Sequence, residues 1–376
     1  MWSIALAAGI LLFLYPFVIY PVVLFFLRPS RPPEDAEATL ELPTVALVVC
    51  ALNEQKIIRQ KVENSLALRY PKEKLRIIFV SDGSTDDTAA ILREYESAGI
   101  ELIEQKVRRG KIANLNEVLA ARREQILVLS DANVIYHADA LAHLVARFRD
   151  PSVGCVSGKV ILTDTMSTLE APTEQYYSLE WFLQEKSSAI YSMAGTDGAM
   201  YALRRELFHR VPNDTIIEDF VIAMKVVRLG RRVVFEPKAL GWEAGPASSR
   251  EEFRRKVRIA AGSAQALIRG NAWPLHAPAR YWFIFISHKL LRWLSPVTGA
   301  ATLLIAALTV RHIPSQLVVA GFLTVGGLAL LRWITGSNKP FLSAPFYFIF
   351  GQVALAIGLA KGVAGQQTVL WAKADR

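Results

Sequence analysis

The stretch Ile126-Leu-Val-Leu-Ser-Asp-Ala-Asn133 is the segment from which we derive the fold, and the other segments are interpreted in relation to it. Its four leading apolar residues are typical of a buried strand, and ligands of α/β sheets bind just beyond the carboxyl ends of such strands. Asp131 and Asn133 place two oxygen ligands in the turn that follows, which suits a Mg²⁺ or Mn²⁺ ion that also holds substrate phosphates. Taken alone, an ordinary strand with an Asp/Asn turn explains the stretch better, so the other segments have to decide.

Apolar strands and amphipathic helices alternate on both sides of this stretch. Strands are expected at Thr44–Cys50, Leu75–Val80, Ile100–Glu104, Gln125–Leu129, Val153–Leu162, in the run that ends at Arg204-Arg205, and at Arg231–Glu236. Helices are expected at Glu54–Leu68, Asp86–Ser97, Lys111–Arg123, Leu169–Ile190 and Ile217–Leu229. This alternation predicts an α/β fold with a mostly parallel sheet and helices on both faces. The first strand is not followed by G-x-G-x-x-G, which argues against a Rossmann dinucleotide site.

Local signals mark where several of these elements begin and end. Thr85 is expected to cap the helix that starts at Asp86, and Gly99 to end the segment. Gly241–Pro246 is expected to be a loop, and Ser249-Arg250-Glu251-Glu252 is typical of a capping box.

The helix that starts at Ser249 is amphipathic and basic. Its apolar face is expected to carry Phe253, Val257, Ala260, Ala261, Ala264 and Leu267, and the remaining surface Arg254, Arg255 and Arg258. Next to membrane segments, such a helix is either interfacial or an ordinary solvated helix that packs on the domain.

Apolar segments flank the central region. Residues 1–27 contain no charged side chain, and this run of spanning length lacks the basic n-region and small-residue cleavage site of a signal peptide. Arg28 and Arg31 follow, so the positive-inside rule predicts the N-terminus outside and the next domain in the cytoplasm. Residues 29–41 are expected to be a linker. Further spans are expected at 295–310, 315–331 and 341–359, preceded by an anchor at Lys289, Arg292 and Trp293; the last span either crosses fully or returns.

Composition limits the remaining classes of function. The chain has 376 residues and a net charge of +9, but no aromatic-basic alternation or motif supports nucleic-acid binding. The positive charge near the apolar segments is better explained by a role in orienting the chain in the membrane and in contacting anionic lipid headgroups than by nucleic-acid binding. Cys50 and Cys155 each fall in a predicted buried strand, so free thiols are expected rather than a disulfide.

Charged residues outside the central stretch carry chemistry of their own. Asp82 ends a strand, where its carboxylate can accept hydrogen bonds from a base or ribose. Lys111 begins a helix, and its ammonium group is a point charge suited to phosphate. Arg255 and Arg258 are three residues apart and could neutralise a departing diphosphate. Glu218-Asp219 opens a helix, where an acid usually stabilises the helix dipole but beside a diphosphate would serve as a general base.

In this order the motifs resemble those of the family 2 membrane glycosyltransferases, which include poly-N-acetylglucosamine, hyaluronan and cellulose synthases. The resemblance covers about residues 44–269 and implies a GT-A fold. The matching motifs are Ala51-Leu52-Asn53-Glu54, Asp82-Gly83-Ser84-Thr85-Asp86-Asp87-Thr88, Gly110-Lys111-x-x-x-Leu115-Asn116, Asp131-Ala132-Asn133, Gly195-Thr196-Asp197-Gly198-Ala199 and Glu218-Asp219.

The resemblance implies a role for each position. Ala51, Asn53, Glu54 and Asp82 would surround the uracil and ribose of a UDP-sugar, and Lys111, Arg255 and Arg258 would contact its phosphates. Asp131 and Asn133 would act through Mg²⁺ or Mn²⁺. Asp219, beside Glu218, would deprotonate the acceptor hydroxyl for an in-line, inverting attack. Gly195, Thr196, Asp197 and Gly198 would line the acceptor site.

Two positions depart from the family pattern. Asn133 stands where a second aspartate is usual, which weakens metal binding or turns the residue toward donor sugar or phosphate. The usual Q-x-x-R-W is here Arg255-Lys256-Val257-Arg258-Ile259, which keeps the arginine but lacks the tryptophan that the resemblance links to processivity. Gln265 and Trp273 are candidates to substitute.

These observations predict a multi-pass inner-membrane enzyme with a cytoplasmic catalytic domain, adding hexose units from a UDP-sugar to a cell-surface or extracellular polysaccharide. Alternatives are single-sugar transfer to a lipid acceptor, a non-enzymatic membrane protein and, less favoured, a transporter. Membrane lipid and an export subunit are possible partners; nucleic acid is not. We divide the chain into a transmembrane helix (1–28), a GT-A domain (42–246), an amphipathic interfacial region (247–280) and a C-terminal transmembrane region (281–376).

Overall fold

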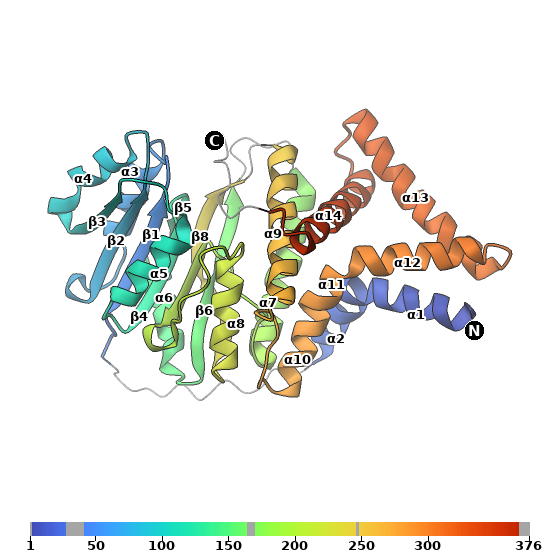
Figure 1. Cartoon of the computed structure of the whole chain (residues 1–376), viewed down its shortest axis with the longest axis horizontal. Coiled ribbons are helices and arrows are strands. Elements are labelled where there is room, and N and C mark those ends of the chain that lie inside the picture. The colour runs from blue at the N-terminus through green and yellow to red at the C-terminus, as the bar shows by residue number, and fades with distance from the viewer. Residues whose placement is uncertain (1, 28–40, 164–169, 246–247, 368–376) are drawn as a thin grey trace.

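The central sheet organises the molecule. The computed structural model describes residues 2–27, 41–163, 170–245 and 248–367. Eight strands follow the order β3-β2-β1-β4-β7-β6-β8-β5 (Figure 1). They are β1 (Val45–Ala51), β2 (Leu75–Asp82), β3 (Ile100–Gln105), β4 (Ile126–Asp131), β5 (Val134–Tyr136), β6 (Val153–Thr163), β7 (Met200–Arg204) and β8 (Arg232–Ala244). Strands β3, β2, β1 and β4 are parallel, as are β6 and β8, whereas β7 runs antiparallel to both neighbours. The predicted, mostly parallel α/β sheet is confirmed.

Helices cover both faces of the sheet because its strands are apolar on both sides. In β1, Ala46 and Val48 join one buried cluster, together with α5 and α8, whereas Val45, Leu47 and Val49 join the other, together with α3 and α6. The helices of this domain are α3 (Ile58–Leu66), α4 (Thr88–Glu94), α5 (Lys111–Ala121), α6 (Ala140–Ala146), α7 (Glu170–Ile190) and α8 (Glu218–Arg228). A near-continuous apolar strand is typical of a parallel strand that is covered twice.

The sheet curls, and its far edge returns to the end of β4. Strand β5 is the last in the strand order and pairs with β8, so that β7, β6 and β8 lie between it and β4, yet only Ala132 and Asn133 separate it from β4 along the chain. The turn formed by Asp131, Ala132 and Asn133, called the Asp131 turn below, is therefore held between two parts of one sheet.

Several local predictions were wrong. The predicted loop Gly241–Pro246 is strand as far as Ala244, because Gly241, Trp242 and Glu243 pair with both β5 and β6; Pro246 lies outside the described residues. The capping box starts one residue early, since Ser248 accepts from the Glu251 N–H. Thr85 is not a cap: helix α4 begins at Thr88, whose N–H donates to Asp86.

Apolar helices form the second part of the molecule. Within the described residues, three helices are long and apolar enough to cross a membrane, namely Trp2–Phe26, α13 (Ile313–Thr335) and α14 (Pro340–Val363). The first is continuous from α1 (Trp2–Leu14) through a π-helical turn to α2 (Tyr20–Phe26). A fourth is obtained if Ala279–Trp293 and α12 (Ser295–Leu308), which meet at a bend of 63°, count as one span. The predicted span at 295–310 is by itself only the 14-residue α12.

Helix α9 (Ser249–Ile268) lies between the sheet domain and α14 (Figure 1). A Cβ atom at Gly262 would lie 2.7 Å from Ile217, just before α8, so the two segments are in close contact. On its other side, Gly358 and Gly362 of α14 touch Ala260 and Ala261. Small residues allow this close approach, so α14 and the domain both cover the apolar face of α9.

Candidate active site

The carboxyl ends of three neighbouring strands bring the first predicted residues together. Cys50 in β1 is paired with Asp131 in β4, and Ala51 with Ser81 in β2, next to Asp82. Ala51, Asp82 and Asp131 therefore lie along one edge of the sheet, where ligands of α/β sheets bind.

Lys111 joins the two acidic motifs. Its ammonium group lies 2.7 Å from Asp131 Oδ1 and 2.8 Å from Glu218 Oε1. Burial opposes the charge of the ammonium group, but the two carboxylates outweigh burial and hold the pKa of Lys111 well above its usual range. The residue predicted to contact phosphate is thus a cation between Asp131 and the start of α8.

Asp82 positions the loop that leads into Lys111. Its two carboxylate oxygens accept from the backbone N–H groups of Arg109 and Gly110 at 2.7 and 2.9 Å. Gly83 adopts φ 68°, and a Cβ atom there would lie 2.5 Å from Arg108 N. Only glycine fits this close approach. Asp82, predicted to bind base and ribose, is also what fixes the start of α5.

Asn53 and Glu54 connect the turns that follow β1 and β2. Asn53 adopts φ 55°, and its Oδ1 accepts from the Thr85 N–H at 2.7 Å. The Glu54 N–H donates to Thr88 Oγ1, also at 2.7 Å. The motif predicted to surround the nucleotide base is therefore a rigid double turn beside Asp82.

Asp219 lies directly against the predicted acceptor loop. A Cβ atom at Gly198 would lie 3.0 Å from Asp219 Oδ2, and Thr196 Oγ1 donates to the Asp219 carbonyl at 3.2 Å. Burial and the neighbouring Glu218 raise the pKa of Asp219 to about 7. Burial also raises the pKa of Asp197, whose Oδ1 accepts from the Ala199 N–H at 3.1 Å. Two of the predicted sets, the acidic pair and the Gly195–Gly198 loop, thus meet.

Two residues near the Asp131 turn were not predicted. Glu243, assigned to a loop from the sequence, accepts from Asn133 Nδ2 at 2.8 Å. Lys61 of α3 is fully buried and donates to Ser130 Oγ at 2.8 Å and to the Val134 carbonyl at 2.5 Å. The signal for Lys61 was its position between Ile58, Val62 and Ser65 on the buried face of a helix.

Helix α9 contacts the loop that precedes Glu218. Arg258 Nη1 donates to the Ile216 carbonyl at 3.3 Å, and Gln265 bonds both Ile216 and Asp214. Arg255 is paired with Glu252 at 2.9 Å, and its charge also lowers the pKa of Asp197 against the larger effect of burial. The charge of Arg255 thus reaches the loop predicted to line the acceptor site, and Arg258 holds the backbone that precedes the acidic pair.

The oxygen atoms around the Asp131 turn fit a divalent ion that is shared with phosphate. With its amide nitrogen held by Glu243, Asn133 retains its oxygen for a metal, beside the carboxylate of Asp131. Within the described residues, no group of three or more His, Cys, Asp or Glu side chains could hold a metal ion. One carboxylate and one amide suit Mg²⁺ or Mn²⁺, which take part of their oxygen ligands from water and substrate phosphates.

Two curated proteins are similar to part of this chain. The probable glycosyltransferase YdaM of Bacillus subtilis is 27% identical over 252 residues, 63% of this chain and 59% of its own. A poly-beta-1,6-N-acetyl-D-glucosamine synthase of Staphylococcus epidermidis is 25% identical over 236 residues, 61% of this chain and 57% of its own. The chain thus spans less than three fifths of the length of these relatives.

A solved structure shares the fold over nearly the whole chain. The mannosyltransferase PcManGT from Pyrobaculum calidifontis, in complex with GDP-Man and Mn²⁺, matches 97% of this chain and 99% of its own with a TM-score of 0.75 and 24% identity. Residues 43–262 match the family model "Glycosyltransferase like family 2", which covers more than half of the sequence. The chain therefore belongs to the family 2 glycosyltransferases.

Proposed function

We propose that the chain is a membrane-bound, inverting hexosyltransferase that transfers a sugar from a UDP-sugar to a growing cell-surface or extracellular polysaccharide. The observation that carries this proposal is the contact of Lys111 with both Asp131 and Glu218, which supports assigning the Asp131 turn to phosphate beside the acidic pair. We assign the catalytic domain to the cytoplasmic side of the inner membrane, because Arg28 and Arg31 follow the first apolar helix.

The donor half of the site would bind the diphosphate through charge. A phosphate that enters between Asp131 and Glu218 would replace these carboxylates as the partner of the Lys111 ammonium group. A divalent ion held by Asp131 and Asn133 would supply further neutralisation of the leaving diphosphate. The relative of known structure was solved with Mn²⁺, so both Mn²⁺ and Mg²⁺ belong in a test of activity.

The acceptor half of the site would supply the base. Asp219 Oδ2 faces Gly198 of the loop assigned to the acceptor, and a pKa near 7 suits a residue that must accept a proton at neutral pH. In the transfer, the acceptor oxygen bonds to the anomeric carbon and its proton passes to Asp219. The bond from that carbon to the diphosphate breaks on the opposite face, so the configuration inverts.

A second candidate is transfer of a single sugar to a lipid acceptor. The position of the usual tryptophan holds Ile259, which is 39% exposed. Both candidate substitutes are engaged elsewhere, since Gln265 bonds Ile216 and Asp214, and Trp273 donates to the Leu267 carbonyl and stacks on Trp282. A non-processive enzyme tolerates this arrangement.

A donor screen tests both candidates. Membranes with the full chain are incubated with radiolabelled UDP-sugars in Mg²⁺, in Mn²⁺ or with chelator, and the product is sized. A polymer that resists lipid extraction supports the polysaccharide synthase, and a single glycosylated lipid supports the alternative. No transfer from any UDP-sugar, combined with transfer from a GDP-sugar, would contradict the assigned donor class.

A further inference from the structure

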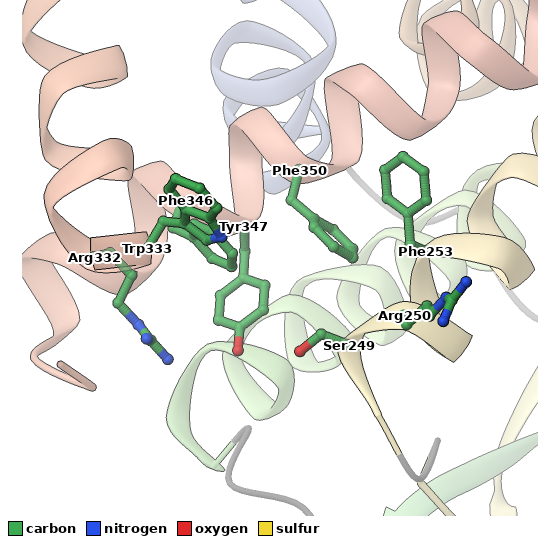
Figure 2. Close-up of a pocket in the computed structure, with 8 residues that line it drawn as sticks. All are labelled: Ser249, Arg250, Phe253, Arg332, Trp333, Phe346, Tyr347 and Phe350. Carbon is green, nitrogen blue, oxygen red and sulfur yellow. The ribbon is translucent and has the colours of Figure 1, made fainter. Parts of the chain in front are cut away.

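A pocket of about 570 Å³ lies where the start of α9 meets the connection between α13 and α14, and it shares no lining residue with the candidate active site. Figure 2 shows its walls, which come from these three helices. The lining residues are Ser249, Arg250, Phe253, Arg332, Trp333, Phe346, Tyr347 and Phe350. Five of the eight are aromatic, two are arginines and none is acidic, so the pocket combines apolar walls with positive charge.

Two contacts hold Arg332 in place. Its guanidinium lies 5.5 Å from the centre of the Phe346 ring, and Nη2 donates to Asn338 Oδ1 at 2.6 Å. Its Nε is buried and has no hydrogen-bond acceptor within the part of the chain that the structure describes. A buried N–H without an acceptor is costly, and an anion that enters the pocket would supply one.

The position of the pocket restricts what such an anion can be. Arg332 and Trp333 lie in the last turn of α13, and Phe346 and Phe350 in the first half of α14, which are both candidate spans. Trp333 is 72% exposed. Tryptophan and arginine at the ends of spans lie at the level of lipid headgroups, so both the apolar walls and the cations face the boundary between membrane and water.

We propose that this pocket binds the phosphate headgroup of an anionic membrane phospholipid. The guanidinium group of Arg332 binds the phosphate, which suits its planar, forked donors, while Arg250, at the opposite end of the pocket (Figure 2), adds to its positive charge. The aromatic side chains contact the glycerol region and the upper acyl chains. Donor and acceptor chemistry do not enter this proposal, so it stands or fails independently of the proposed transfer reaction.

Binding here would also hold the helix that supports the acidic pair. Arg250 is in the first turn of α9, and Gln265 near its other end bonds Ile216 and Asp214 before Glu218. Between them, Gly358 of α14 packs on Ala260. A lipid that fills the pocket contacts α9, α13 and α14 together, and therefore holds α9 at the end where Ser248 provides its cap.

Native mass spectrometry of the delipidated full chain in neutral detergent tests this proposal. Phosphatidylglycerol and phosphatidylcholine are titrated separately against the wild type and against an Arg250→Gln/Arg332→Gln variant. The matched control is Arg254→Gln/Arg311→Gln, which removes two exposed arginines outside the pocket. We expect phosphatidylglycerol to bind more tightly, and the pocket variant to lose about fivefold in affinity for each arginine, while the control does not change.

Three results would overturn the proposal. These are equal affinity for the two lipids, an equal loss in the control variant, and full displacement of phosphatidylglycerol by inorganic phosphate, which would show a plain anion site. If the double variant fails to fold, Arg332→Lys is the second variant, because it keeps the charge but loses the planar fork. Its affinity for phosphatidylglycerol should fall while its thermal unfolding does not change.

Discussion

Lys61 donates a hydrogen bond of 2.8 Å to the hydroxyl oxygen of Ser130, from a helix that precedes the Asp131 turn by about 70 residues. The same ammonium group reaches the Val134 carbonyl on the far side of the turn. One buried side chain thus connects both ends of the segment that carries Asp131 and Asn133. The position of the Asp131 turn therefore depends on Lys61, which bonds the residues on either side of it.

Replacing Lys61 with methionine should weaken this support. The variant leaves the Ser130 and Val134 acceptors without their donor, at a cost of about 1–3 kcal/mol in the free energy of unfolding. The donor KM should rise more than the acceptor KM, because the turn that holds the diphosphate loses its anchor. Denaturant unfolding and initial-rate kinetics measure the two effects. An unchanged donor KM would show that the turn keeps its place without Lys61.

The pH dependence of stability should also identify Lys61. Burial lowers its pKa from 10.5 to about 7, against the opposing charge of Asp131. Between these values the unfolded chain binds the extra proton, so the stability of the wild type should rise with pH from about 7 to 10.5. The Lys61→Met variant should lack this part of the rise when both proteins are unfolded over the same pH range.

Transfer should require an ionised Asp219. Asp219→Asn should lower the rate by about 10²–10⁴-fold while UDP still binds, as measured by calorimetry. In the wild type the rate should rise as the pH passes through about 7, because the carboxyl must lose its proton to act as a base. Glu218→Gln removes a negative charge that raises the pKa of Asp219, so the rise should move to lower pH. A profile that stays in place would exclude Asp219 as the titrating group.

Adding a methyl group at position 198 should disturb the base but spare the donor. The Cβ of Gly198→Ala would lie 3.0 Å from Asp219 Oδ2, so the carboxylate has to move. We expect kcat to fall while UDP affinity is kept. Gly321→Ala is the control, because nothing lies within 4 Å of a Cβ there. If both variants keep full activity, the acceptor loop does not contact the base during transfer.

Activity should depend more on Asp131 than on Asn133. Asp131 is a carboxylate in contact with Lys111, whereas Asn133 is neutral and bound to Glu243. Asp131→Ala should abolish metal-dependent transfer, and Asn133→Ala should raise the metal concentration needed for half-maximal rate. Glu243→Ala should resemble Asn133→Ala, because it releases the same amide. Equal losses from the Asp131 and Asn133 variants would contradict this order.

The elements that the sequence predicted well are those with long apolar runs. Strands β1, β2 and β4 were recognised because continuous buried residues end in polar turns, and the same pattern located Asp82 and Asp131. Strand β5 was missed because three residues, Val134 to Tyr136, give no periodicity. The continuation of β8 was missed because it contains Pro237 and Gly241, which usually end strands.

Contacts between distant segments could not be obtained from the sequence. The approach of Gly198 to Asp219 depends on how β7 and α8 pack, and the Asn133–Glu243 bond on the curl of the sheet. No role was predicted for Lys61, because lysine is rarely buried. Only the fold shows that its ammonium group lies under the turn.

The two-residue link between β4 and β5 has a consequence for redesign. Ala132 and Asn133 alone connect β4, in the middle of the strand order, to β5 at its end, so an inserted residue would pull Val134 away from its partner Glu243 in β8. Exchanging side chains at positions 131, 133 and 243 is therefore the way to alter the proposed metal and diphosphate binding. Lengthening the turn would instead open the sheet.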